Sequence, residues 1–330
     1  MSSIFVMAAG KGTRLTPWTL AVPKPVLPVA NEPALGFLLR LAARHGYRDI
    51  VANASWLGDV LTGVIGDGSA YGVQLDWQHE DEPLGTAGGV LHAQDALRDG
   101  DEPVIVLSGD GIHDVDLAAV ERTHRASGAL VTLAVVQVAD PSQFGVAVID
   151  ATGRITGFEE KPAAGAAHGN LANTGIYVLD PRVLDRCAAW GLTDFGSELF
   201  PRLLAEGAPL QTHDMGDAYW NDIGDLDEWR ASNIAAVTGA IDLGVHHDDS
   251  DLTSIHGAGV LVHPSATISA DATLAFGTIV GAGAHVGSGV YLASALILPG
   301  AHVPDGSVIA SGTFGSLAGL EAWATELAAH

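Results

Sequence analysis

Aliphatic residues recur every six positions over the last quarter of the chain, and Gly, Ala and Ser fill most of the positions between them. This repeat is typical of a left-handed parallel β-helix, in which aliphatic side chains point inward and small residues form the corners. We expect about three coils and a final packing helix with an apolar face over residues 317–327. The repeating residues are Val262, Ile268, Leu274, Val280, Val286 and Leu292 and, after a one-residue slip, Ile297, Val303 and Ile309.

A different pattern fills residues 1–240, where short β-rich runs alternate with helical patterns. This alternation predicts a Rossmann-like α/β fold, a mostly parallel sheet with helices on both faces and ligands at the carboxyl ends of its strands. Strands are predicted at Ser3–Ala8, Ile50–Ala54, Val73–Trp77 and Val104–Ser108, with a further β-rich stretch at Leu130–Leu179. Helices are predicted at Pro33–His45, Trp56–Ile65, Thr86–Leu97, Phe195–Glu206 and Leu226–Val237.

The two patterns divide the chain into a catalytic domain (1–240), a linker (241–257) and the β-helix with its terminal helix (258–330). The linker includes the polar run His246–Asp251, which has no periodicity. Histidines beside aspartates raise the possibility of a metal site. No turn or partner ligands flank them, so a solvated linker is the better interpretation.

The formal net charge of the 330-residue chain is −24. Nucleic acids and acidic membranes both require a basic surface, so we expect neither as a partner. No apolar run is long enough to span a bilayer, and Met1–Ala9 is too short for a signal peptide. The single cysteine, Cys187, fits a reducing cytoplasm and is expected to be a small buried hydrophobe.

Lysine is almost absent from the sequence. Only Lys11, Lys24 and Lys161 occur, although lysine is normally a common surface residue. An acidic protein that handles anionic substrates requires isolated cations of this kind, helped by a metal ion. We therefore expect these three residues to have local functions.

The first predicted strand runs directly into Ala8–Leu15, which contains Gly-Lys-Gly. Glycines after a strand let backbone N–H groups approach a polyphosphate. A dinucleotide-binding fingerprint would require a third glycine where Leu15 stands, and a P-loop would require Ser or Thr where Gly12 follows Lys11. The pattern becomes specific only together with Pro23-Lys24-Pro25 downstream.

With these segments the chain resembles the sugar-1-phosphate nucleotidyltransferase family, whose motifs follow in the family's order. The resemblance implies a GT-A-type catalytic domain and an enzyme that joins a nucleoside triphosphate to a sugar 1-phosphate and releases pyrophosphate. The β-helix also resembles the tail of several subfamilies. The motifs are Gly-x-Gly-Thr-Arg-Leu-x-Pro (residues 10–17), Pro23–Pro25, Glu82–Gly88, Ser108–Asp110, Glu160–Pro162, Asn173–Gly175 and Trp220–Gly224.

The resemblance also implies roles for single residues. Arg14 and Lys24 would be the catalytic cations, and Asp110 and Asp222 would hold Mg²⁺. Four residues would bind the sugar phosphate: Gly145, Glu160, Lys161 and Asn173. Nucleotide contacts would come from Ala8, Ala9, Gly10, Gly12, Thr13, Gly85, Thr86 and Gly88.

The chemistry supports these roles independently. Two highly charged phosphates repel each other, so in-line attack requires cations, and a divalent metal fixed by two carboxylates supplies them best. Phosphoryl transfer needs little covalent participation from the protein, so we expect no covalent intermediate. His113 is expected to be structural, because an ionised sugar phosphate needs no general base. Tyr219 and Trp220 are expected in the core.

The identity of the substrates is less constrained by the sequence. The segment Leu84–Gly88, which we call the lip, resembles that of the mannose-1-phosphate guanylyltransferase branch, and it lacks the glutamine common in thymidylyltransferases. We expect GTP with mannose 1-phosphate or a related sugar or pseudo-sugar phosphate. Thymidylyl-, uridylyl- or adenylyl transfer to glucose 1-phosphate stays open, as does a non-catalytic regulatory relative. The β-helix favours a homo-oligomer, and an acyltransferase function of the β-helix is disfavoured.

Overall fold

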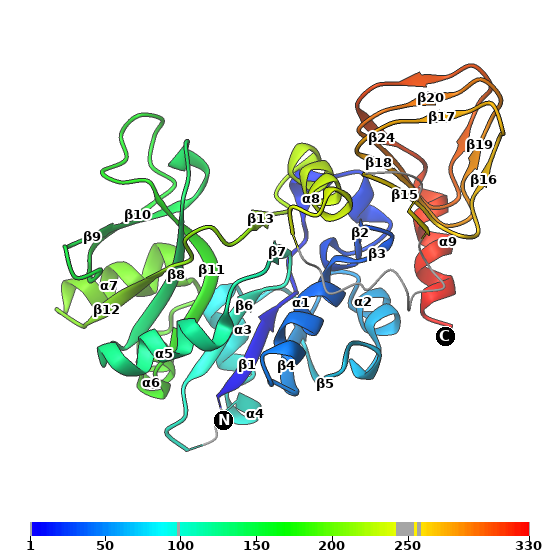
Figure 1. Ribbon diagram of the computed structural model, residues 1–330. Helices are drawn as coiled ribbons and strands as arrows, with labels where there is room; N and C mark the ends of the chain where they lie inside the picture. The colour runs from blue at the N-terminus through cyan, green and yellow to red at the C-terminus, as the bar shows by residue number, and fades with distance from the viewer. Residues whose placement is uncertain (1, 98–99, 242–253, 256–258, 330) are drawn as a thin grey trace.

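A nine-stranded sheet forms the centre of the N-terminal domain (Figure 1). The structure is a computed structural model that describes residues 2–97, 100–241, 254–255 and 259–329. The strand order is β10-β9-β11-β6-β1-β4-β5, and β8 pairs with β11 and β12. The strands are β1 (Ser3–Met7), β4 (Asp49–Ala54), β5 (Gln74–His79), β6 (Val104–Ser108), β8 (Val131–Gln137), β9 (Gly145–Ile149), β10 (Ile155–Glu160), β11 (Leu171–Leu179) and β12 (Leu210–Asp214).

The half of the sheet built from residues 3–108 is parallel, as the alternating pattern predicts. β1 pairs in parallel with β4 and β6, and β4 with β5. The other half is largely antiparallel, because β11 runs against β6, β8 and β9, and β10 runs against β9. The sheet is therefore mixed, and the expected parallel arrangement applies to its first half.

Helices cover both faces of the sheet. Ile4 and Val6 of β1 pack in a core with residues of α1, α2 and α8, whereas Phe5 packs with residues of α3, α6 and α7. Cys187 is buried in the second core, as expected. The helices are α1 (Ala34–Arg44), α2 (Gly58–Ile65), α3 (Thr86–His92), α4 (Gln94–Leu97), α5 (Leu117–Ser127), α6 (Pro181–Trp190), α7 (Phe200–Ala205) and α8 (Leu226–Thr238).

Two predicted helices differ from the observed ones. The helix expected at Thr86–Leu97 is interrupted at Ala93 and forms α3 and α4. The helix expected at Phe195–Glu206 begins as a π-helical turn, η6 (Phe195–Leu199), before α7. Short 3-10 turns lie in the connecting segments: η1 (Thr13–Leu15), η2 (Trp18–Leu20), η3 (Lys24–Val26), η4 (Ser69–Tyr71) and η5 (Pro141–Gln143).

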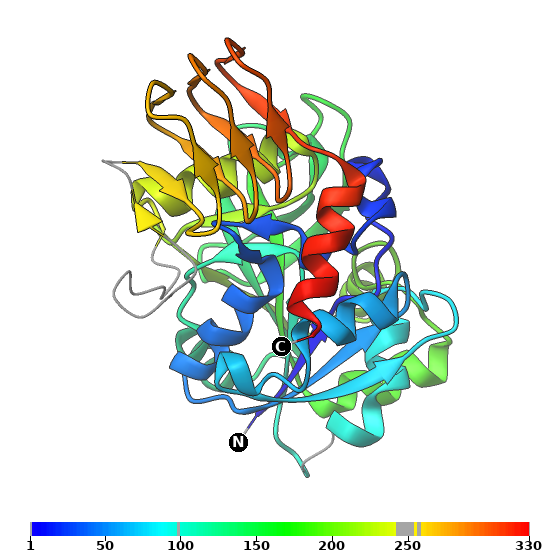
Figure 2. The ribbon, with the colours of Figure 1, turned by 90° about the vertical axis from the view of Figure 1, so that its right-hand side faces the viewer.

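The C-terminal region forms the expected parallel β-helix of three coils, consistent with the left-handed type. Val262 lies beside Val280, and Val280 lies beside Ile297, in neighbouring coils. Helix α9 (Leu317–Leu327) follows the coils and packs against α2 (Figure 2). The strands are β15 (Val260–Val262), β16 (Thr267–Ile268), β17 (Thr273–Leu274), β18 (Thr278–Val280), β19 (His285–Val286), β20 (Tyr291–Leu292), β21 (Ala295–Ile297), β22 (His302–Val303), β23 (Val308–Ile309) and β24 (Gly312–Phe314).

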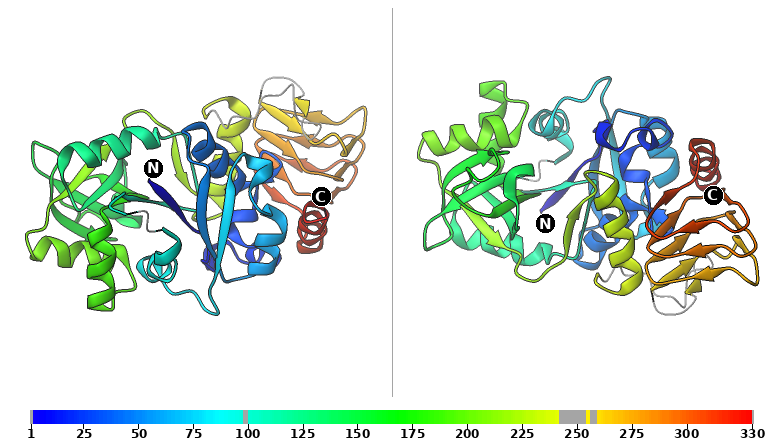
Figure 3. Two further views of the ribbon diagram at one scale, coloured as in Figure 1. Left: turned by 90° about the horizontal axis from the view of Figure 1, so that it is seen from below. Right: turned by 90° about the horizontal axis from the view of Figure 1, so that it is seen from above.

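The β-helix and the β9–β10 end of the sheet lie at opposite ends of the molecule (Figure 3). Helix α8 packs on one face of the β-helix, against β15, β18, β21 and β24. The hairpin of β2 (Pro28–Val29) and β3 (Glu32–Pro33) completes this junction, because Asn31 Nδ2 donates to the Val280 carbonyl at 3.1 Å.

Part of the predicted linker can be compared with the structure. Within 241–257, β14 (Ser254–Ile255) pairs with β15, whereas the polar run His246–Asp251 lies outside the described residues. In the described parts of the chain, every helix is too short or too polar to cross a membrane.

Candidate active site

Two carboxylates meet at a buried ammonium group beside the sheet edge. Asp110 follows β6, and Asp222 ends β13 (Trp220–Asp222), whose pairing with β7 (Gly111–His113) places Asp222 opposite Gly111. Lys24 is 8% exposed, and its Nζ donates to Asp110 Oδ2 at 2.5 Å and to Asp222 Oδ1 at 3.1 Å. Three segments distant in sequence thus converge on one charge cluster.

The charges of this cluster do not balance. Burial alone would lower the pKa of Lys24, but Asp110 and Asp222 outweigh it and the pKa is raised, so the ammonium stays charged. Burial opposes ionisation of Asp110, yet Lys24 lowers the pKa of this carboxyl. The pKa of Asp222 is raised, first by burial and then by Asp110. One buried cation therefore faces two carboxylates.

This arrangement fits a divalent cation. Asp110 and Asp222 present hard oxygen donors to one point, and their combined charge exceeds that of Lys24. Ser108 Oγ donates to Asp110 Oδ1 at 2.5 Å and orients that carboxylate. Across the described ranges, no cluster of three or more His, Cys, Asp or Glu side chains could hold a metal. Phosphate oxygens and water are further ligands suited to such a site.

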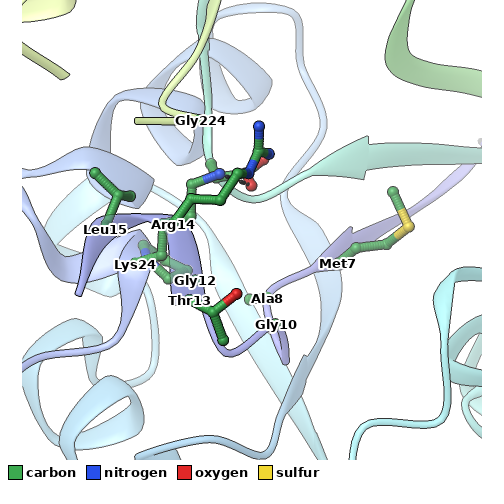
Figure 4. Close-up of a pocket in the computed structure, with 11 residues that line it drawn as sticks. Met7, Ala8, Gly10, Gly12, Thr13, Arg14, Leu15, Lys24 and Gly224 are labelled. Carbon is green, nitrogen blue, oxygen red and sulfur yellow. Dashed lines mark hydrogen bonds and ion pairs between the residues drawn. The ribbon is translucent and has the colours of Figure 1, made fainter. Parts of the chain in front are cut away.

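The loop after β1 lines a pocket of about 270 Å³ above Lys24 (Figure 4), which we call the loop pocket. Gly12 has φ 61°, and a Cβ there would lie 3.0 Å from Thr19 Cγ2 and 3.1 Å from Lys24 Cβ. The left-handed φ and these close approaches favour glycine at this position. The lining residues are Met7, Ala8, Gly10, Gly12, Thr13, Arg14, Leu15, Lys24, Pro25, Asp110 and Gly224.

A second pocket of about 170 Å³, the wall pocket, adjoins the first and shares Arg14 and Asp110 with it. The Arg14 side chain is 61% exposed, and its Nη2 lies 3.9 Å from Asp222 Oδ2. Arg14 packs beside Gly224, where a Cβ would lie 3.2 Å from Nη1 (Figure 4). The other lining residues are Ser108, Gly111, Gln143, Phe144, Gly145, Glu160, Lys161, Asn173, Thr174, Gly175, Tyr177, Trp220 and Asp222.

The polar groups of the wall pocket are held in fixed orientations. Asn173 Nδ2 donates to the Tyr177 hydroxyl at 2.9 Å, and Asn173 Oδ1 accepts from the Gly175 N–H at 3.1 Å. Burial raises the pKa of the Glu160 carboxyl. The Lys161 ammonium group, 3.8 Å from Glu160 Oε1, opposes this rise. The pocket therefore offers an amide, a carboxyl and an exposed ammonium group to a polar ligand.

The lip lies outside both pockets and is anchored from two sides. Glu80 Oε2 accepts from the Leu84 N–H at 2.9 Å, and Glu80 Oε1 accepts from Asn53 Nδ2 at 2.7 Å. Asn53 Oδ1 in turn accepts from the Ala8 N–H at 2.6 Å. This buried network joins the lip to the loop pocket. At Gly85, φ is 84° and a Cβ would lie 2.4 Å from the Thr193 carbonyl oxygen, so this position requires glycine.

Most residues singled out in the sequence come together in the two pockets, whereas Ala9, Gly85, Thr86 and Gly88 line neither. His113 is buried and lines neither pocket, as expected of a structural residue. Trp220, expected in the core, is only partly buried and lines the wall pocket. Sequence reasoning missed Glu80 and Asn53, which carry no local motif signal.

His113 should govern part of the acid sensitivity of the fold. Neither ring nitrogen has a hydrogen-bond partner among the described residues, and burial lowers the pKa of His113 to about 4. An unfolded histidine binds a proton near 6.5, so stability is lost as pH falls from about 6.5 through 4. We expect His113→Leu to avoid about 2 kcal/mol of the loss between pH 7 and 5. Urea unfolding of the wild type and of His113→Leu at pH 7 and pH 5 measures the change in the free energy of unfolding. An equal loss in the two proteins would contradict the expectation.

The whole N-terminal domain matches a family of known proteins. The family model described as "Nucleotidyl transferase" matches residues 4–236. A UTP–glucose-1-phosphate uridylyltransferase of Synechocystis is 37% identical over 68% of this chain and 61% of its own length. A mannose-1-phosphate guanylyltransferase of Mycobacterium tuberculosis is 36% identical over 82% of this chain and 72% of its own length. This chain therefore spans less than two thirds of the Synechocystis relative.

A solved structure shows the same similarity. A Bacillus anthracis protein, provisionally assigned as a glucose-1-phosphate thymidylyltransferase and solved with a sucrose, superposes with a TM-score of 0.62 at 25% identity. The match covers 72% of this chain and 95% of that chain.

Proposed function

Because the chain belongs to the nucleotidyl transferase family, we propose that it is a sugar-1-phosphate nucleotidyltransferase. The observation that carries the proposal is the pair of adjoining pockets with Arg14 and Asp110 in both and Lys24 beneath them. Such a geometry suits two anionic substrates that must approach each other. The glycine-containing loop pocket would take the triphosphate, and the wall pocket would take the sugar phosphate.

In the proposed reaction, a phosphate oxygen of the sugar 1-phosphate attacks the α-phosphorus of the nucleoside triphosphate. The new P–O bond forms as the bond to the leaving pyrophosphate breaks, and no proton has to be removed from the nucleophile. Arg14 and Lys24 neutralise the charge that the two phosphates bring together. Glu160 and Asn173 orient the sugar hydroxyls, and Lys161 contacts the sugar phosphate.

Mg²⁺ is the metal that we propose at Asp110 and Asp222. When bound, it would supply further neutralisation of the phosphate oxygens. The two carboxylates and the balance of charge around Lys24 support this assignment.

For the substrates, we propose GTP with mannose 1-phosphate or a related sugar phosphate. The lip sequence Leu84–Gly88 and the similarity to the guanylyltransferase of Mycobacterium tuberculosis support this choice. The similarity to the uridylyltransferase of Synechocystis makes UTP with glucose 1-phosphate the second candidate. We further propose that the protein works in the cytoplasm as a homo-oligomer, as its single cysteine and β-helix favour.

Pyrophosphate release tests the proposal directly. The full chain is incubated with Mg²⁺ and each of GTP, dTTP, UTP, ATP and CTP, crossed with mannose, glucose and N-acetylglucosamine 1-phosphates. Release in the GTP and mannose 1-phosphate pairing, abolished by Asp110→Asn, is the expected result. Release with UTP and glucose 1-phosphate would select the second candidate. If no pair reacts and calorimetry detects no nucleotide binding, the protein is not a nucleotidyltransferase.

A further inference from the structure

One segment of the chain contacts both the lip and the sugar side of the proposed site. The Thr86 hydroxyl donates to Asp194 Oδ2 at 3.0 Å and accepts from the Phe195 N–H at 2.9 Å. The Thr193 carbonyl accepts from the N–H groups of Ala87 and Gly88, at 2.9 and 3.2 Å. The lip is thus bound to residues 193–195 by four hydrogen bonds.

The same segment continues to Gly196, which lies against Glu160. A Cβ on Gly196 would lie 2.6 Å from Glu160 Oε2, and a Cβ on Gly145 would lie 3.0 Å from the same oxygen. The Glu160 carboxylate therefore lies against two glycines, and a side chain at either position would crowd it. Burial raises the pKa of Glu160, Lys161 opposes this, and the charge of Asp194 adds to the rise.

The segment is also held by hydrogen bonds and ring contacts of its own. Asp194 Oδ1 accepts from both the N–H and the hydroxyl of Ser197, each at 2.7 Å. Behind the turn, the Phe195 and Phe200 rings stack at 5.9 Å, and both pack against the Tyr177 ring at 5.3 Å. The turn itself is π-helical, a form common at functional sites. A shift of the lip would therefore displace Gly196 relative to Glu160.

We propose that Asp194 and the η6 turn are positioning elements that couple the nucleotide lip to Glu160. A base bound under the lip fixes the position of Thr86. The η6 turn, which is hydrogen-bonded to Thr86, then fixes the position of Glu160. Nucleotide and sugar phosphate therefore strengthen each other's binding. The coupling is reciprocal, because each ligand changes the affinity for the other by the same factor. The inference rests on the proposed function, and it adds a structural link between the nucleotide specificity and the sugar-phosphate specificity of the site.

A double-mutant cycle tests the coupling. The variants are Thr86→Val, which removes both hydroxyl hydrogen bonds, Glu160→Gln, and their combination. The readout is kcat/KM for the sugar phosphate at saturating nucleotide, with thermal unfolding as a check of folding. Direct effects of Thr86→Val on nucleotide binding cancel in the cycle. Each single change should lower kcat/KM, and the double variant should be at least about five-fold more active than the product of the two losses predicts.

Matched variants separate coupling from general damage. Thr86→Ser keeps both hydrogen bonds, so Glu160→Gln should cost as much in that background as in the wild type. Gln143 lines the wall pocket from η5, a different turn from η6, so the losses of kcat/KM caused by Thr86→Val and by Gln143→Ala should multiply. If Thr86→Val does not fold, Asp194→Asn weakens the same contact from the other side.

The possible results are distinct. If the enzyme is active and the double variant Thr86→Val/Glu160→Gln loses as much kcat/KM as the product of the two single losses, the coupling is overturned and the proposed function stays intact. A wild type that releases no pyrophosphate with any substrate pair and binds no nucleotide in calorimetry would overturn both.

Discussion

Lys24→Met should destabilise the protein by about 3 kcal/mol, because it leaves two partly buried carboxylates without their shared cation. The Lys24 side chain is 9% exposed and is hydrogen-bonded to both Asp110 and Asp222, so solvent cannot replace it fully. Activity should fall at least about 10³-fold with it, since one of the two proposed catalytic cations is lost. Denaturant unfolding and pyrophosphate release measure the two effects.

The same variant is a sensitive test of the metal site. With the ammonium group gone, Asp110 and Asp222 are free to bind Mg²⁺, which should stabilise Lys24→Met by about 2.7 kcal/mol at a hundred-fold excess over Kd. The double variant Lys24→Met/Asp222→Asn is the control. Without Mg²⁺, this double variant should be more stable than Lys24→Met. Mg²⁺ should change its free energy of unfolding little. Equal responses of both variants to Mg²⁺ would remove the two carboxylates from consideration as metal ligands.

Arg14→Ala should abolish activity with little effect on folding. The guanidinium group borders both pockets, and an arginine that neutralises transferring phosphates is worth about 10³-fold or more in rate. Its side chain is 61% exposed, and its only ion pair with a described residue spans 3.9 Å to Asp222, so we expect stability to change by less than about 0.5 kcal/mol. Steady-state kinetics and thermal unfolding on the same preparation show whether the two effects separate.

Two further variants sharpen the Arg14 experiment. Arg14→Lys keeps the charge and loses the planar fork, so it should recover only part of the rate. Arg182→Ala removes an arginine of comparable exposure (70%) that pairs with Asp180 at the start of α6, and it should leave kcat/KM unchanged. A loss below about ten-fold for Arg14→Ala would make Arg14 an ordinary surface charge.

The fold could be predicted from the sequence wherever a single period dominates. The six-residue repeat through Val262, Val280 and Val286 predicts the β-helix because each coil buries the same kind of residue. Alternation also predicts the parallel half of the sheet. The antiparallel half could be predicted only as β-rich, because pairing of β11 with β6, β8 and β9 depends on contacts distant in sequence.

The site was predictable to the extent that its residues stand in motifs. Asp110 and Asp222 lie in two of them, yet neither motif indicates that Lys24 bridges both carboxylates, since that follows from three segments folding together. Nor does the sequence indicate the η6 turn, because an extra residue in one helical turn leaves the apolar spacing of residues 195–206 almost unchanged. Trp220 is expected in the core, yet it is only partly buried and lines the wall pocket.

The scarcity of lysine has a practical consequence for anyone who attaches a probe to this protein. Lys24 is buried beneath the pockets, Lys161 lines the wall pocket, and Lys11 belongs to the loop after β1, 5.9 Å from the Trp56 ring centre. Apart from the amino-terminal amine, amine-reactive dyes and amine-coupling sensor surfaces would therefore react only at lysines in or near the proposed site. Such reagents would act as affinity labels, and protection by nucleotide or sugar phosphate would map occupancy. Immobilisation for binding studies should instead use an attachment point on the outer face of the β-helix.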